Sequence, residues 1–288
     1  MTEQEKAVAE GVSSSGRRGF MVGAGSLAGL AVLGSTVGAR SKALDNPLAA
    51  AEDVDGPLPY AYINPNEILP LARSNHIAGM KCGMGSFAAI IEKLREEVGE
   101  PYYGVPTATT YWSGGGGAGW SAVCGAVVGA NTAISVVHGD TGTTMKLVDE
   151  LQRWYTQHKF PQYTPPTDAE GMTEELPTSH PQEILCHVSV TNWCQETGYA
   201  SGSSERSERC HRLTAETAAR AVELLNAEHE GNFDNVATAM DPPTVDSEKG
   251  CRSCHFKGDD FSGGQFTRGK MECMGCHGGA PHLPDSLK

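Results

Sequence analysis

A short pattern of cysteine and histidine occurs twice near the end of the chain, as Cys251-Arg-Ser-Cys254-His255 and as Cys273-Met-Gly-Cys276-His277. Both copies have the form C-x-x-C-H, and both lie in a segment after Gly231 that is rich in Gly, Asp and Pro and shows little apolar periodicity. Such a segment cannot bury enough aliphatic surface to offset the conformational entropy that ordering costs. The pattern therefore predicts that a bound group orders the tail.

Haem is the group that this pattern favours. In c-type cytochromes the two thiols of C-x-x-C-H form thioether bonds to the porphyrin, and the adjacent histidine ligates the iron. We therefore expect two haem c groups, with covalent attachment through Cys251, Cys254, Cys273 and Cys276 and with His255 and His277 as proximal iron ligands.

A zinc ribbon is the rival interpretation, because 18 residues separate Cys254 from Cys273 and the four cysteines also fit C-x₂-C-x₁₅₋₂₀-C-x₂-C. A ribbon requires neither His255 nor His277. The histidine at the same offset in both copies therefore favours haem.

The beginning of the chain has the pattern of an export signal. Residues 15–21 are S-G-R-R-G-F-M, and the Gly- and Ala-rich apolar stretch 22–37 follows this arginine pair. A twin-arginine pair before a short apolar stretch is typical of a Tat leader, and this stretch is too weakly hydrophobic to indicate a membrane span. We expect a leader over residues 1–39, cleavage after Ala39 or Ala43, and a periplasmic protein with no stable membrane span after cleavage. An uncleaved, membrane-anchored amino terminus is the alternative.

Composition excludes some partners. The 288 residues have a net charge of −13, 39% hydrophobic residues and 20% charged residues. These proportions are ordinary for a globular protein, and the negative charge argues against nucleic acid and anionic lipid as partners. A basic patch on a redox partner protein would fit such a surface.

Apolar periodicity between the leader and the tail predicts an all-α fold. We expect four main helices, over residues 87–98, 120–137, 143–158 and 207–230, and shorter helical structure around residues 184–193. The second helix is almost free of charge, and Gly139 is expected to end it. Proline-rich residues 161–181 should form a connection, and residues 45–70 an extended arm with a short turn of helix at most.

The leader, the proline-rich arm, the helical periodicity and the haem motifs together divide the chain into four parts. The expected architecture is a helical bundle of about four main helices with an irregular C-terminal haem-binding tail. The parts are a leader at 1–39, an extended N-terminal arm at 40–75, a helical domain at 76–232 and a dihaem segment at 233–288.

Five further cysteines are spread over the helical part, namely Cys82, Cys124, Cys186, Cys194 and Cys210. Thiolates on several packed helices can converge on an iron-sulfur cluster. The glycine run 114–117 before Cys124 would let backbone N–H groups approach inorganic sulfide, and the chain lacks the G-K-[ST] of a phosphate loop. Disulfides and buried inert thiols are the alternatives. Tat export favours a cluster, because clusters are normally assembled in the cytoplasm before transport.

The order of these cysteines resembles a redox-active family that is named for its C, GCAxxG, C and C pattern. The segments that resemble it are Met80-Lys-Cys82-Gly, Val123-Cys124-Gly-Ala-Val-Val-Gly129, Leu185-Cys186, Trp193-Cys194 and Arg209-Cys210. Together with the two haem motifs, this combination resembles the split-Soret cytochromes c over about residues 77–280. The chain differs in having Val123 where the pattern has Gly, and in having five candidate thiols rather than four.

The resemblance implies a helical-bundle homodimer with two haems per subunit and a separate iron-sulfur centre, for which a [2Fe–2S] cluster is the favoured type. Which of the five cysteines would ligate the cluster stays open at this point.

Electron transfer between redox partner proteins is the function that these motifs favour. A catalytic haem reductase is the alternative, and it requires one iron with an open axial position. Eight of the ten histidines lie outside the two motifs and can supply distal ligands. This argues for six-coordinate irons in which both axial positions are filled. The chain is therefore more simply interpreted as a non-catalytic carrier than as an enzyme.

Helix geometry selects the candidate distal ligands. His138 follows Cys124 by 14 residues and His229 follows Cys210 by 19, which places each roughly 20 to 30 Å from the thiols along its helix. His282 lies five residues after His277 and would reach the other haem or the partner subunit's haem. We expect the distal ligands to come from His138, His229 and His282, with Met240 or Met271 as alternatives, and His76, His158, His187 and His211 to stay near the thiols.

Overall fold

The computed structural model describes residues 57–237 of the chain. Its α-helices are α1 (Pro65–Asn75), α2 (Lys81–Glu97), α3 (Gly125–His138), α4 (Gly142–Gln157), α5 (Cys186–Thr197), α6 (Ser204–His229) and α7 (Phe233–Ala237). Short 3₁₀ turns at Tyr102–Gly104 and Thr107–Ser113 and a π-helical turn at His76–Met80 lie between them. The expected all-α fold is confirmed. Among the described helices, none is both long and apolar enough to cross a bilayer.

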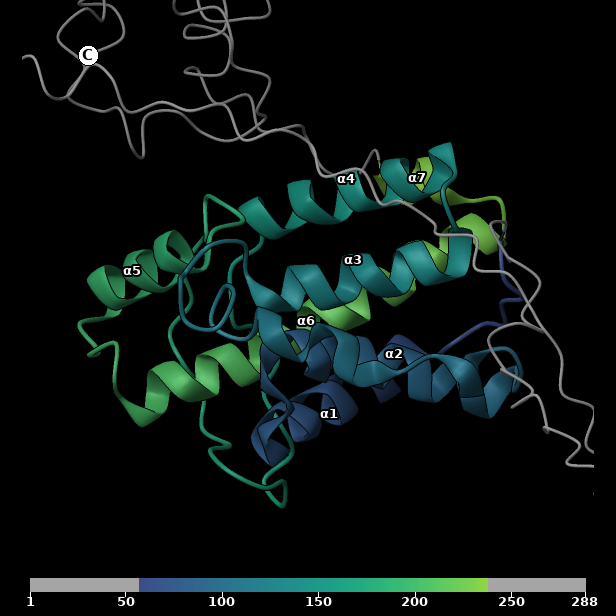
Figure 1. Ribbon diagram of the computed structural model, residues 1–288. Coiled ribbons are helices and arrows are strands. Elements are labelled where there is room, and N and C mark those ends of the chain that lie inside the picture. Colours follow the sequence, from purple (N-terminus) through teal and green to yellow (C-terminus); the bar gives the residue numbers. More distant parts are fainter. Residues whose placement is uncertain (1–56, 238–288) are drawn as a thin grey trace, which may run out of the picture. The chain divides into compact units, whose positions relative to one another are not determined.

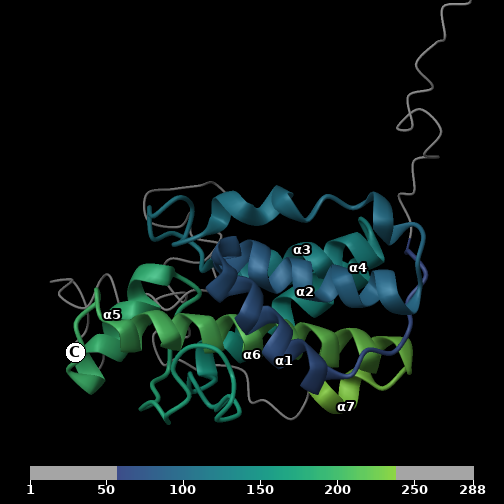
Figure 2. The same ribbon diagram turned by 90° about the horizontal axis from the view of Figure 1, so that it is seen from below.

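The helices form a bundle around α6, the longest of them. Helix α2 packs against α3, α3 against α4, and α1 against α6, which also contacts α2, α3 and α4. Figures 1 and 2 show α5 at one end of this bundle and α7 at the other. The bundle therefore has two ends, which are called the α5 end and the α7 end below.

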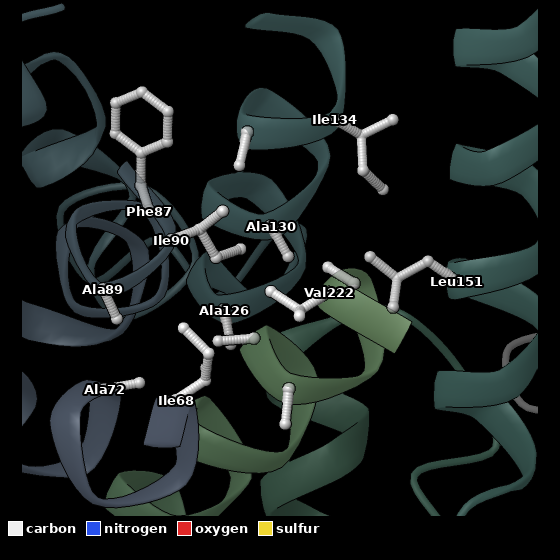
Figure 3. Packing of buried hydrophobic residues seen from close by; sticks show 14 of the residues in the cluster. Ile68, Ala72, Phe87, Ala89, Ile90, Ala126, Ala130, Ile134, Leu151 and Val222 are labelled. Atoms are coloured by element: carbon white, nitrogen blue, oxygen red, sulfur yellow. The ribbon is translucent and has the colours of Figure 1, made fainter. Parts of the chain in front are cut away.

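Aliphatic side chains from five helices meet in the centre of the bundle (Figure 3). Ile90 of α2, Ile134 of α3, Leu151 of α4 and Val222 of α6 are fully buried there. The facing surface of α3 has small residues, and a Cβ placed on Gly129 would lie 2.0 Å from the carbonyl oxygen of Gly83. Only glycine therefore permits this approach of α3 to α2.

The Gly129→Ala protein is expected to be less stable than the wild type by about 3 kcal/mol, because the new methyl group must push two helix backbones apart. The control is Gly142→Ala at the start of α4, where a Cβ would meet nothing within 4 Å. It should be neutral or slightly stabilising. Denaturant unfolding followed by circular dichroism measures both variants, and equal midpoints for the two would contradict this account of the α2–α3 contact.

Most of the expected helices are confirmed, with two corrections. Helix α3 begins at Gly125 rather than at residue 120, because the glycine loop continues to Ser121 at φ 60° and Cys124 is the N-cap. The part of the expected extended arm from residue 65 onward is helical. Helix α1 starts with Pro65 and is capped by the Asn64 side chain, and its buried Ile68 packs in the core. Gly139 ends α3, as expected.

Candidate metal centre

Four thiols from four separate segments meet at the α5 end of the bundle. Cys82 lies in the first turn of α2, Cys124 caps α3, Cys186 begins α5 and Cys210 lies in the second turn of α6. Each of the four interacts electrostatically with at least two of the others. A Cβ on Gly125 would lie only 2.4 Å from the sulfur of Cys82, so the α2 thiol lies directly against the backbone beside Cys124.

An isolated antiparallel bridge brings Cys124 and Cys186 together. Residues Val123 and Leu185 pair, the N–H of Cys124 donates to the carbonyl of Ile184 at 2.8 Å, and the N–H of Cys186 donates to the carbonyl of Ala122 at 2.7 Å. These bonds fix the start of α5 against the start of α3, although about 60 residues separate the two cysteines in the sequence. The bridge is thus what positions the third thiol.

The glycine run supplies backbone N–H groups to the same place. Gly115, Gly116 and Gly117 have φ values of 64°, 72° and 88°, a left-handed conformation that glycine adopts without strain. The N–H of Gly115 faces the Cys82 sulfur and lowers its pKa, opposing burial. The N–H groups of Ala126 and Val127, at the start of α3, act in the same way on Cys124. The N–H groups therefore favour negatively charged sulfur at Cys82 and Cys124.

Burial nevertheless favours the protonated form of Cys82, Cys124 and Cys186 in the absence of a metal. It raises the pKa of Cys82 and of Cys186 to about 12, and it also raises the pKa of Cys124. Neighbouring cysteines raise the pKa of each of these three thiols further. A bound metal would have to displace the protons, so binding would release them.

The iron-free protein is expected to lose stability as the pH rises above about 9. Thiols in the unfolded chain ionise there, whereas folded Cys82 and Cys186 hold their protons up to about pH 12, so the unfolded state binds fewer protons within this window. Each such group lowers the free energy of unfolding by up to about 1.4 kcal/mol per pH unit. Denaturant unfolding over this range measures the slope. The slope should be smaller in Cys186→Ala, and an identical slope would contradict the assignment.

A buried polar group borders the thiols on the side of α4, α5 and α6. The Arg209 guanidinium donates to the Ser189 hydroxyl at 2.8 Å, and the Tyr155 hydroxyl lies 3.2 Å from the same oxygen. The Tyr155 hydroxyl also faces the sulfur of Cys124 and lowers the pKa of that thiol. Sequence reasoning missed all three residues as part of the site, because Tyr155 belongs to an apolar helix face and Arg209 to a run of charged residues.

Cys194 is not part of this group. It lies eight residues after Cys186 on α5, about 12 Å along the helix axis, and it is absent from the interactions that act on Cys82, Cys124 and Cys186. All five cysteines between residues 57 and 237 are free thiols, so the disulfide alternative is not formed there. Among residues 57–237, no three His, Cys, Asp or Glu side chains are placed close enough to hold a single metal ion.

Histidines lie at both ends of the bundle. His76 and His211 lie at the α5 end with ring centroids 4.6 Å apart, and His187 follows Cys186 directly. At the α7 end, His138 ends α3 near Glu228, and the ring of His229 lies 5.4 Å from that of Tyr60.

His158, which was expected near the thiols, instead lies between the two ends, where its Nε2 is 2.8 Å from the carboxylate of Glu216 in the middle of α6. His282, Met240, Met271 and both C-x-x-C-H motifs lie outside the described residues.

Four neighbouring thiols on a helical bundle, beside a glycine loop, define a class of redox-active domain. The family model described as putative redox-active protein (C_GCAxxG_C_C) matches residues 82–224. A curated protein, the split-Soret cytochrome c of Desulfovibrio desulfuricans, is 35% identical over 271 residues, which cover 92% of this chain and 95% of that protein. The chain belongs to the split-Soret cytochrome c family.

A solved structure agrees with this assignment. It is described as a novel iron centre in the split-Soret cytochrome c from Desulfovibrio desulfuricans ATCC 27774, and it matches with a TM-score of 0.69 and 33% identity. The match covers 80% of this chain and 94% of that one. The resemblance inferred from the motifs is thus confirmed at the level of both sequence and fold.

Proposed function

We propose that the chain is an exported dihaem c-type cytochrome that transfers electrons between redox partner proteins and holds an iron-sulfur cluster at Cys82, Cys124, Cys186 and Cys210. The observation that supports the cluster most directly is the mutual electrostatic interaction of these four thiols, which come from four segments and of which Cys82 and Cys124 are buried. When bound, such a cluster stores one electron. The related split-Soret cytochrome c structure, which is described as having a novel iron centre, supports the same proposal.

The residues at the site fit an anionic metal cluster. Thiolate ligands are negative, and the site offers the N–H of Gly115, the start of α3 and the buried Arg209 as compensating groups. The buried Nε of Arg209 has no hydrogen-bond partner in the described part of the chain, which is what a site designed for a further anion would show. Four ligands of this kind suit a [2Fe–2S] cluster.

The haem part of the proposal rests on the two C-x-x-C-H motifs, with His255 and His277 as proximal ligands, and on the name of the related protein. His138 and His229 lie at the α7 end, the end at which α6 leads into the chain that precedes the motifs. We therefore keep these two, with His282, as the candidate distal ligands.

The remaining parts of the proposal follow the sequence. Residues 1–39 are the Tat leader of a periplasmic protein, residues 76–232 the helical domain and residues 233–288 the dihaem segment, and the protein is a homodimer. The support is the twin-arginine pair, the composition change after Gly231 and the membership of the split-Soret family.

Purification and metal analysis test the proposal. We expect two covalent haems per chain, two non-haem irons and two acid-labile sulfides, with a low-spin haem spectrum that carbon monoxide leaves unchanged. A colourless protein containing zinc would refute the haem assignment. Rapid stoichiometric carbon monoxide binding would indicate an open iron and would overturn the assignment as a pure carrier.

A further inference from the structure

Arg209 is a buried cation whose surroundings do not neutralise it. Arg209 is only 1% exposed, and its Nε has no hydrogen-bond partner among residues 57–237. The ion pairs found among residues 57–237 do not include it. Burying an unpaired charge costs several kcal/mol, so such a group is retained where an anion is expected to compensate it.

Two neighbouring buried arginines, unlike Arg209, have a carboxylate partner. Arg73 and Arg212 are equally buried, but both donate to the carboxylate of Glu208, at 2.8 and 2.7 Å. Both arginines also donate to the carbonyl of Met172. They thereby join α1 and the segment 161–181 to α6, and each guanidinium has hydrogen-bond partners. Arg209 is one residue after Glu208 and points to the other side of α6, toward α5, where Ser189 accepts its hydrogen bond.

Ser189 and Tyr155 extend the charge of Arg209 to the thiols. The Tyr155 hydroxyl hydrogen-bonds the Ser189 oxygen at 3.2 Å, and it also faces the Cys124 sulfur, whose pKa it lowers. While Cys124 is a neutral thiol, the tyrosine proton can go to Ser189, as the observed bond has it. Once Cys124 is a thiolate, it can only accept, so the tyrosine must donate to it and the serine hydroxyl must donate to the tyrosine oxygen.

In that state all three groups donate in one direction, from α6 through α5 and α4 to the N-cap of α3. The four residues are nearly or fully buried, Cys124 at 7% exposure being the most exposed. Hydrogen bonds in series polarise one another, and a low dielectric strengthens them. The series of hydrogen bonds therefore transmits the polarising effect of the Arg209 guanidinium, through two hydroxyl groups, to the Cys124 sulfur.

We propose that Arg209, Ser189 and Tyr155 form a polar relay that compensates the negative charge of the thiolate site and raises its reduction potential. The inference rests on the proposed function, because it requires a redox-active cluster on Cys124 and the other three thiols. Reduction adds one electron, and hence one unit of negative charge, to that site, and the electron comes from a low-potential one-electron donor. A fixed cation and a donated hydrogen bond stabilise the more negative form.

The test is a redox titration of the full-length holoprotein with dithionite, in which electron paramagnetic resonance follows the reduced cluster. In Arg209→Gln the ratio of oxidised to reduced cluster at a given potential should rise at least tenfold, equivalent to a midpoint about 59 mV lower for one electron. Arg209→Lys, which keeps the charge, should recover most of this shift. Tyr155→Phe and Ser189→Ala should each lower the midpoint by a smaller amount.

Arg206→Gln is the matched control. It removes the same charge from the same helix, four residues before Cys210, from a side chain that donates to the Ser201 carbonyl at the exposed start of α6. Its midpoint should equal that of the wild type. A structural role for Arg209 would reduce cluster content without moving the midpoint of the clusters that remain.

The outcomes separate the inference from the function on which it rests. Non-haem iron and sulfide are measured in every variant. Unchanged midpoints in loaded Arg209→Gln, Tyr155→Phe and Ser189→Ala would overturn the relay and leave the cluster standing. Absence of iron and sulfide from the wild type would overturn both. If Arg209→Gln fails to fold, the two hydroxyl variants decide, and unchanged midpoints in both refute the relay.

Discussion

The Cys251→Ala and Cys273→Ala proteins are each expected to contain about one covalent haem per chain instead of two. Each substitution removes one of the two thioether bonds of its motif, and the remaining single thiol holds the porphyrin poorly against loss during maturation. The pyridine haemochrome spectrum and the intact mass of each variant measure the haem content. Because the porphyrin supplies apolar surface that the tail lacks, the variants should also be more sensitive to proteolysis.

Matched controls lie inside the same motifs. Arg252→Ala and Met274→Ala change the residues between the cysteines, which the C-x-x-C-H pattern leaves free, and both should keep two haems. A zinc ribbon predicts a different result, in which the cysteine variants lose zinc and none of the proteins contains haem. Two haems in either cysteine variant would equally contradict the assignment.

Much of the bundle could be predicted from the sequence, because the apolar faces and N-caps that indicate its helices are local sequence patterns. The helix expected at 143–158 is α4, Gly142–Gln157, and the one expected at 207–230 is α6, Ser204–His229. Both have a regular apolar face and a hydroxyl N-cap, Thr141 in α4 and Ser203 in α6.

Helix α1 could not be predicted in this way. Its prolines at 65 and 70 indicate irregular structure when they are considered locally, and the helix depends instead on tertiary packing. Ile68 and Ala72 are fully buried in the core of the bundle, where α1 packs against α6. This contact joins segments about 150 residues apart, and no local pattern contains it.

The candidate site could likewise be predicted only in part from the sequence. The sequence supplies all five cysteines and the glycine run, and it places His138 and His229 far from the thiols by helix length alone. It does not distinguish Cys186 from Cys194, because both lie on one short helix, and the bridge between Val123 and Leu185 makes the choice. Arg209 stands in the polar run S-E-R-S-E-R-C-H-R, which suggests a solvated face, whereas Glu208, Arg209 and Arg212 are all buried.

Alanine substitution of any one of Cys82, Cys124, Cys186 and Cys210 is expected to remove most of the non-haem iron and acid-labile sulfide. A cluster with four thiolate ligands loses one coordination bond with each change. Non-haem iron and sulfide per chain are measured on purified protein. Haem content and helicity, measured on the same samples, should stay at wild-type values, which separates loss of ligation from misfolding.

Cys194→Ala is the decisive comparison, because Cys186 and Cys194 are on the same helix and are both partly exposed. Any general effect of removing a thiol from α5 should appear in both variants, whereas loss of ligation should appear in Cys186→Ala alone. Cys194→Ala is therefore expected to keep wild-type iron and sulfide. If it loses as much of both as Cys186→Ala does, the four-thiol assignment is wrong. In that case the ligands would have to include a thiol two helical turns from the bridge that joins α5 to α3.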